Sequence, residues 1–171
     1  MTPSLSDSHD PPLYLPRQKA VYIGRVADHD VADTPYAYYL HSRDELFLGE
    51  YSEDGFEPSY ALAVDSPTMG AAADRFRGLD HLSTDLSVIG VALCKAHTFA
   101  ETHVLGTQQA YVYVLRDVYG FSQPDTAKIL DIGVSTVSSH LSDARANVEG
   151  ARILVEGLDE LTNEREGRTV P

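Results

Sequence analysis

Three predicted helices, joined by two very short connections, constrain the fold of this chain more than any other feature of its sequence. Helical spacing of apolar residues places them over 107–118, over 122–130 and from Val134 onward. Gly120 ends the first helix, and residues 131–133 leave only a three-residue turn before the third. Because so few residues separate the helices, consecutive helices must cross steeply and pack on each other.

The second helix carries clear signals at its start. Ser122 is a capping residue, Pro124 is tolerated in the first turn, and Asp125 suits the third helical position. Ile132 can fill the angle between the second and third helices, and Gly133 can adopt an unusual backbone conformation or cap the third. These signals predict a turn of fixed geometry.

The third helix separates an apolar face from a hydroxyl-rich face. Val137 and Leu141 are predicted to be buried. The outward-facing hydroxyl residues are Ser135, Thr136, Ser138, Ser139 and Ser142. Short hydroxyl side chains allow close approach to a DNA groove and can exchange hydrogen bonds with base edges and phosphates. We therefore expect this face to contact DNA.

At these residues the chain resembles the helix-turn-helix shared by region 4 of sigma-70-type factors and LuxR-type response regulators. The residues that carry the resemblance are 115–122, 126–130, 134–141 and Ala144-Arg145. The resemblance implies a sequence-specific regulator of transcription that binds double-stranded DNA, has possible contacts to the transcription machinery, and uses no cofactor. The expected DNA-contacting residues are Ser135, Thr136, Ser138, Ser139, His140, Ser142, Arg145, Lys128 and Gln123.

Two positions depart from the family pattern. Ser138 stands where relatives commonly have Lys or Arg, and Asp143 stands where many are basic. The usual contacts from basic side chains to phosphate are therefore missing, which predicts weak DNA binding in low salt.

The charge balance sharpens this expectation. The chain has 13 basic and 26 acidic residues, a net charge of −13, and only three lysines. Such a surface repels DNA in dilute buffer. Many acids with few lysines are typical of proteins from halophiles that accumulate salt, which predicts an archaeal source adapted to high salt; an acidic mesophilic protein is the alternative. In ~1 M salt the Debye length is only ~3 Å, so the repulsion is screened.

The acids are unevenly distributed. Residues 105–148 carry three basic and four acidic residues, whereas residues 1–103 carry seven and sixteen. This asymmetry favours DNA contact through the C-terminal part. The rival hypothesis is a protein-interaction or DNA-mimic module whose acidic surface occupies the basic site of a transcription or nucleoid protein. Only Asp143 lies near the exposed face of the third helix, which favours DNA.

An α+β fold is predicted for the whole chain. Residues 1–16 are rich in proline and predict a disordered tail, residues 17–103 a β-rich domain with two helices, and residues 104–171 the helix-turn-helix domain with a long terminal helix. The strands of a small antiparallel sheet are expected at 20–23, 36–40, 45–51 and 60–64.

Two helices are expected to follow the strands. One begins at Ser66 and Pro67, which suit the cap and the first helical position, and the other begins near Thr84. The β-branched residues over 88–91 leave a strand open as the alternative for the second.

The terminal helix is predicted to continue to about Leu161 and to pair with a second copy. Its dimer-interface residues, at spacings of three and four, are Val148, Ala151, Val155 and Leu158. Ile153, Leu154 and Leu161 widen the apolar face, which leaves open packing on the N-terminal domain. Gly150 and Gly157 each weaken the helix by about 1 kcal/mol, so a strong isolated coiled coil is not expected.

Other functions find little support in the sequence. Cys94, His97 and His103 lie close together, but no second ligand pair at zinc spacing accompanies them, and we expect a buried thiol and surface histidines. No phosphate-binding loop or catalytic motif is present, so we expect neither an enzyme nor a metal site. The absence of an apolar run long enough to span a membrane, and of signal-peptide features in residues 1–10, predicts a cytoplasmic protein.

The N-terminal strands contain many tyrosines. They are Tyr22, Tyr36, Tyr38, Tyr39, Tyr51 and Tyr60. Such residues can line a small-molecule pocket or an interface, but ordinary packing within a sheet is the simpler explanation.

Overall fold

The computed structural model describes residues 11–27, 35–65, 68–79 and 82–168, and confirms the α+β fold with an antiparallel sheet. The strands are β1 (Tyr14–Leu15), β2 (Ala20–Val26), β3 (Tyr36–Leu40), β4 (Glu45–Ser52), β5 (Gly55–Ala61) and β6 (Thr84–Leu86). They pair in the order β1-β2-β3-β4-β5, and β6 pairs with the far end of β2.

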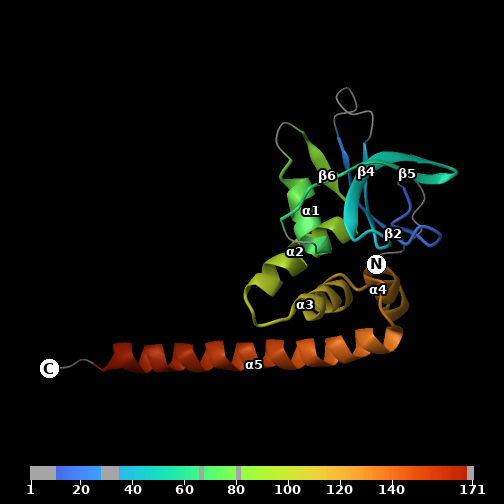
Figure 1. Cartoon of the computed structure of the whole chain (residues 1–171). Helices are drawn as coiled ribbons and strands as arrows, with labels where there is room; N and C mark the ends of the chain where they lie inside the picture. The colour runs from blue at the N-terminus through green and yellow to red at the C-terminus, as the bar shows by residue number, and fades with distance from the viewer. Residues whose placement is uncertain (1–10, 28–34, 66–67, 80–81, 169–171) are drawn as a thin grey trace.

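Helices follow the sheet in sequence. They are α1 (Met69–Arg77), α2 (Val88–Glu101), α3 (Thr107–Tyr113), the π-helical turn η1 (Val114–Val118), α4 (Gln123–Leu130) and α5 (Val134–Gly167). Figure 1 shows α1 and α2 against one face of the sheet, with α3 and α4 between the sheet and α5. Among the residues that the structure describes, no helix is both long and apolar enough to cross a membrane.

Order begins earlier than the proline-rich composition predicted. Residues 1–10 lie outside the described residues, but the expectation of disorder through residue 16 is wrong. Tyr14 pairs with Val21 across β1 and β2, and the hydroxyl of Tyr38 donates to the carbonyl of Pro12 at 2.9 Å. These contacts hold the segment on the sheet because its prolines lie outside the paired strand.

One predicted strand and the start of one predicted helix also differ from the structure. The strand expected at 60–64 is instead β5, which ends at Ala61; it tolerates Pro58 because it lies at the edge of the sheet, where the register shifts. The helix expected from Thr84 begins only at Val88, capped by Ser87, because residues 84–86 pair with β2. The cap predicted at residues 66–67 lies outside the described residues, and Thr68 caps α1.

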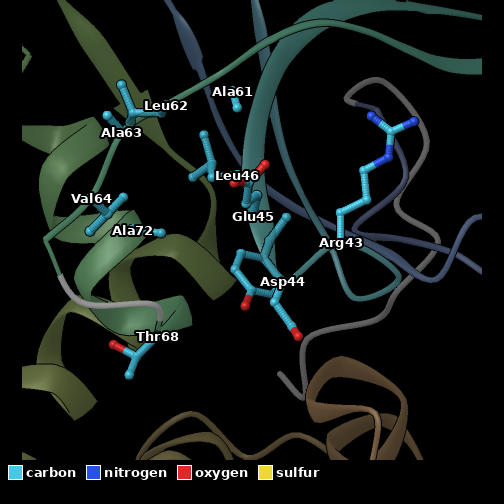
Figure 2. A pocket seen from close by; sticks show the side chains of 11 residues that line it. Arg43, Asp44, Glu45, Leu46, Ala61, Leu62, Ala63, Val64, Thr68 and Ala72 are labelled. Carbon is cyan, nitrogen blue, oxygen red and sulfur yellow. The ribbon is translucent and has the colours of Figure 1, made fainter.

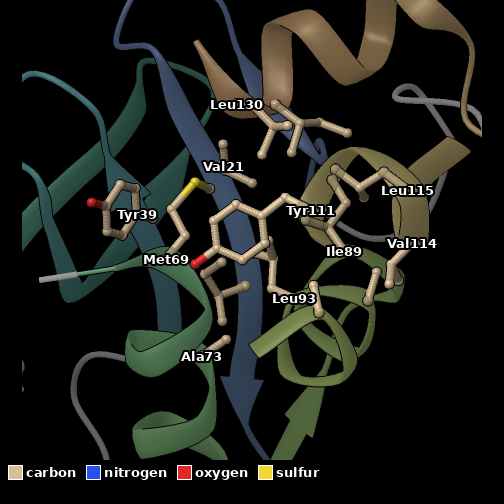
Figure 3. Packing of buried hydrophobic residues seen from close by; sticks show 14 of the residues in the cluster. Val21, Tyr39, Met69, Ala73, Ile89, Leu93, Tyr111, Val114, Leu115 and Leu130 are labelled. Atoms are coloured by element: carbon tan, nitrogen blue, oxygen red, sulfur yellow. The ribbon is translucent and has the colours of Figure 1, made fainter. Parts of the chain in front are cut away.

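A single hydrophobic core extends through both predicted parts of the chain. Figure 3 shows Val21 of the sheet and Met69 of α1 beside Tyr111 and Leu130 of the C-terminal helices. The hydroxyl of Tyr111 accepts a buried hydrogen bond from the backbone N–H of Gly70 at 2.7 Å. The helix-turn-helix is therefore packed directly onto the sheet and its covering helices.

The longest helix, α5, has 34 residues and passes the predicted end at Leu161. Its inner half, residues 134–148, packs on α3 and α4, and its outer half, residues 149–167, projects from the body of the molecule (Figure 1). The fully buried residues of α5, Val137, Leu141 and Ala144, all belong to the inner half. One continuous helix thus has two different environments.

Candidate nucleic-acid interface

The turn between α4 and α5 fixes the direction in which α5 leaves the turn. Asp131 takes the left-handed conformation, with φ 53° and ψ 47°, which aspartate tolerates better than most residues. The N–H of Ile132 then donates to the carbonyl of Ala127 at 3.0 Å. Of the two roles expected for Gly133, the structure shows the cap of α5.

Gln123 joins the start of α4 to the start of α5. Its side-chain amide nitrogen donates to the carbonyl of Val134 at 2.9 Å and to Oγ of Ser138 at 2.6 Å. At the same end of α4, Oγ of Ser122 accepts from the N–H of Asp125 at 3.1 Å, as the capping signal predicted. Gln123, expected among the DNA-contacting residues, therefore also braces the two helices.

The hydroxyl face of α5, defined as Ser135, Thr136, Ser138, Ser139 and Ser142, is exposed throughout. Val137 and Leu141 on the opposite side are buried against the rest of the helix-turn-helix. His140 is half-buried and lies at the border between the two faces. The face presents small polar groups on a helix that its buried side holds in place, which suits insertion into a groove.

Arg145 is held by an ion pair that sequence analysis missed. Its guanidinium donates to both carboxylate oxygens of Asp117 at 2.8 Å. The bond to Arg145 lowers the pKa of the Asp117 carboxyl below its ordinary value of 3.8. The two residues are 28 positions apart, so no local sequence pattern predicts the pair. An arginine held this way is less available to a phosphate.

Lys128 is the more accessible cation of the expected set. It lies exposed near the end of α4 and forms no ion pair with the residues that the structure describes. Asp143 is exposed on α5, near the hydroxyl face. The interface is consequently polar and weakly charged, and hydrogen bonds rather than ion pairs must supply most of its attraction to DNA.

Two side chains of the N-terminal sheet contact the helix-turn-helix at the end of α4. Nζ of Lys19 lies 3.2 Å from Oδ1 of Asp131, and Nε2 of His41 lies 2.8 Å from the carbonyl oxygen of Ile129. Neither partner was predicted, because both contacts join residues about ninety or more positions apart. The sheet thus supports the turn that aims α5.

The end of the first helix also differs from the prediction. Helical spacing of apolar residues in the first helix puts Val118 on the same side as Ala110, Val114 and Leu115, but Val118 is 51% exposed whereas the other three are buried. The π-helical turn η1 supplies the reason, because its wider turn shifts the positions that follow it around the helix. The N–H of Tyr119 donates to the carbonyl of Val114 at 3.0 Å, and Gly120 then takes φ 74°. Val118 therefore faces away from the core.

The tyrosines of the sheet divide between its two faces. Tyr22, Tyr38 and Phe56 lie in one aromatic cluster, with Tyr36 and Tyr51 beside it, on the face away from α1 and α2. This arrangement is the ordinary sheet packing that the sequence analysis favoured for most of them.

Tyr39, on the other face, lines a surface hollow of about 470 Å³ between β4, the chain after β5, and α1. Figure 2 shows Arg43 pointing away from Leu62, Val64 and Thr68 at this hollow. With acidic Asp44 and Glu45 at its rim and an arginine turned outward, the hollow presents no convergent set of polar groups, and we assign it no ligand.

The residues around Cys94 do not converge. The thiol is 3% exposed, and burial raises its pKa to about 11, which makes it an unreactive core group. His97 lies 3.6 Å from Glu101 on the surface of α2, and His103 lies in the following turn. Among the described residues, no three potential ligands gather into a metal site.

Comparison with known proteins supports the C-terminal assignment. Residues 104–148 match the family described as Sigma-70, region 4, and the match does not extend to residues 1–103. No curated protein and no solved structure matches the chain. The segment from the start of α3 to the inner half of α5 therefore matches a region-4 helix-turn-helix, a domain of the kind that binds DNA in transcription.

Proposed function

We propose that this protein is a sequence-specific regulator of transcription that inserts the hydroxyl face of α5 into the major groove of double-stranded DNA. The observation that carries the proposal is the exposed row of hydroxyls on a helix that belongs to a region-4 domain. Ser138 and Ser139 belong to this row, and Gln123 donates to Ser138 from α4; we include Lys128, His140 and Arg145 in the proposed DNA-contacting set. Side chains this short bring the helix backbone close to the bases.

We further propose that the protein works in concentrated salt, in a halophilic, archaeal cytoplasm. A net charge of −13 opposes DNA binding in dilute buffer, whereas molar salt screens that repulsion. With Arg145 paired to Asp117, few cations remain to release counterions from DNA. Affinity should therefore change little between ~0.5 and 2 M salt, because the slope of log affinity against log salt counts phosphate contacts. A steep loss of affinity in folded protein contradicts this part of the proposal.

Two copies are included in the proposal. One helix-turn-helix reads a short half-site, and pairing of two copies doubles the sequence that is read. Val155 and Leu158, predicted at the dimer interface, are 57% and 53% exposed on the outer half of α5. Val148 and Ala151 of the same predicted set are half-buried.

The decisive test removes the central hydroxyls. The preferred sequence is first selected from random DNA in molar salt, and the affinities of S138A, S139A and the double variant are then measured. Each lost hydrogen bond should weaken binding roughly 2- to 12-fold. S138A also removes the contact with Gln123, so S139A isolates the loss of a groove contact.

The matched control is Thr162→Ala, which deletes an exposed hydroxyl from the outer half of the same helix. It should leave the DNA affinity unchanged. Unaltered affinity in the double serine variant would show that the contact surface lies elsewhere. A protein that selects no DNA at any salt, yet binds a basic DNA-binding protein, would instead establish the mimic hypothesis.

A further inference from the structure

The outer half of α5 exposes a row of leucines. Leu154 and Leu161 are each 63% exposed, more than the other large apolar residues that the structure describes, and Leu158 is 53% exposed. Spacings of four and three residues place the three on one side of the helix. Figure 1 shows this half projecting into solvent, clear of the sheet. A contiguous apolar row on a projecting helix favours association with another apolar surface.

We propose that a second copy of this chain covers the leucines by packing its own α5 antiparallel to the first, with the crossing point midway between Val155 and Glu156. This inference rests on the homodimer of the proposed function and gives its direction and register. It moves the seam from the predicted stripe to the leucine side, about 100° around the helix from Val155, with Leu158 common to both. Two observations about the outer half, the positions of its glycines and of its charges, select this arrangement.

The first observation is a match between large and small residues. Gly150 and Gly157 lie on the same side of the helix as the leucines, and a Cβ built on either would meet no atom within 4 Å. In the antiparallel pair, Leu154 stands at the height of Gly157 of the partner subunit, and Leu161 at the height of Gly150 of the partner subunit. Each leucine then enters the space that a glycine leaves, as a knob enters a hole.

A parallel pair lacks this match. In register, every residue meets its own copy, so glycines face glycines and leucines face leucines. The first contact leaves a void and the second pushes the helices apart, and both reduce the packing density of the seam. The antiparallel register resolves both problems with the same residues.

The second observation is the distribution of charge along the helix. Residues 156–166 carry five acidic residues and one basic residue, whereas residues 145–155 carry two basic and one acidic. A parallel pair aligns the two acidic ends, but an antiparallel pair sets each against the more basic half. Arg145 and Arg152 already pair along their own chain with Asp117, Glu149 and Glu156, so this preference comes from the overall distribution of charge and not from a new ion pair in the seam.

The register also fixes the separation of the two DNA-contacting faces. Ser138 lies on both copies well outside the crossing point, so the two Ser138 residues are ~52 Å apart along the common helix axis at 1.5 Å per residue. The distance between the centres of two half-sites bound by one dimer should be of this order.

Sedimentation equilibrium of the full chain in 2 M salt, across roughly 1–200 µM protein, tests the seam. The wild type should be a dimer. Leu154→Lys should weaken dimerisation roughly 100-fold or more while the circular dichroism spectrum stays native, because the lysine charge would have to be buried in the seam. The matched control is Ile153→Lys, since Ile153 is 57% exposed but lies about 100° around the helix from Leu154. It should remain a dimer.

Distances between spin labels test the direction. In a Cys94→Ala background, labels at E164C should lie ~26 Å apart in the antiparallel pair, compared with about 10 Å in a parallel pair. Labels at E156C, beside the crossing point, should lie close together in either case and serve as the control. A distance near 10 Å at residue 164 overturns the antiparallel register.

A monomeric wild type, or a Leu154→Lys variant that remains dimeric, overturns the seam itself. These outcomes are separate from the DNA-binding proposal, which is tested on a single half-site. A monomer that binds a half-site would overturn the dimer proposal and support DNA binding. A dimer that binds no DNA would support the dimer proposal and overturn DNA binding.

Discussion

The inner and outer halves of α5 are continuous in backbone but differ in what stabilises them. The inner half, residues 134–148, buries Val137, Leu141 and Ala144 against its own chain. The outer half, residues 149–167, has no fully buried residue, although it is as apolar in places. The region-4 match ends at residue 148, where this change occurs. Sequence periodicity is similar across both halves, so periodicity alone does not distinguish a helix packed in its own chain from one that awaits a partner.

The comparison implies different dependence on the rest of the molecule. The inner half belongs to a core that includes the sheet, α1 and α2, whereas the outer half contacts the body of its own chain very little. The inner half should therefore respond to changes far away in the sequence. The outer half should respond to changes in protein concentration.

The largest expected effect comes from cutting the chain. A fragment of residues 104–171 should lose cooperative folding, because it exposes the core surface of Tyr111 and Leu115 that α1 and α2 cover. A chain ending at residue 148 should keep the native fold and lose only its dimer. Dispersion of amide signals in two-dimensional NMR spectra distinguishes these cases. A well-dispersed spectrum from the fragment would show that the helix-turn-helix folds without the sheet.

Truncation of one apolar side chain in each half of α5 gives the next effect. Leu141→Ala should lower the free energy of unfolding by about 2–5 kcal/mol, because it leaves a cavity in a buried seam. Ile153→Ala, on the exposed outer half, should change it by less than about 0.5 kcal/mol. Urea denaturation at one low protein concentration measures both. Equal effects would mean that the outer half is packed on its own chain in solution.

The sequence predicted the elements whose signals are local. The capping serine at 122, the tight turn at 131–133 and the alternation of buried and exposed residues from Val134 were all sufficient to place the helix-turn-helix. The N-terminal part was predicted less well. Residues 84–86 look helical by themselves and form a strand only because β2 offers a partner, and Pro58 suggests a break although an edge strand accepts it.

The candidate site shows the same division. Exposure of the hydroxyl face followed from helical spacing, and the structure places those residues together on one surface. The contacts that hold Arg145 and the turn between α4 and α5 could not be predicted from helical spacing, because they connect residues from different elements. Asp117 with Arg145, and His41 with Ile129, are brought together only by tertiary packing.

A smaller effect on stability should come from the contact between the sheet and the end of α4. His41→Ala removes the hydrogen bond to the carbonyl oxygen of Ile129 and should cost about 1 kcal/mol of stability. Hydrogen exchange should quicken in α4 and in the inner half of α5, but not in the outer half. His97→Ala, at a half-buried position on α2 away from α4, is the control and should leave these rates unchanged. Equal acceleration along all of α5 would argue against separate environments for its two halves.

The smallest effect on stability is expected from the ion pair in the inner half, between Asp117 and Arg145. Replacing Asp117 with Asn should destabilise the fold less than Leu141→Ala or His41→Ala, because the Arg145 side chain is 57% exposed and solvent screens the pair. The pKa of Asp117 is lowered in the folded chain, so its contribution is fully present above the ordinary value of 3.8 and disappears as pH falls through the lowered value. Wild type and Asp117→Asn should therefore converge in stability under strongly acidic conditions and differ near neutrality. Divergence at low pH would contradict this sign.

The same substitution should affect DNA binding more clearly than stability. Without Asp117, Arg145 is free to reach a phosphate, so affinity in moderate salt should rise and the slope of log affinity against log salt should steepen by about 0.9. Glu149→Gln is the matched control in the outer half, because Arg152 keeps its bond to Glu156 and lies away from the hydroxyl face. Its slope should equal that of the wild type. An unchanged slope in Asp117→Asn would place Arg145 outside the DNA contact, and a steeper slope in Glu149→Gln would extend that contact into the outer half.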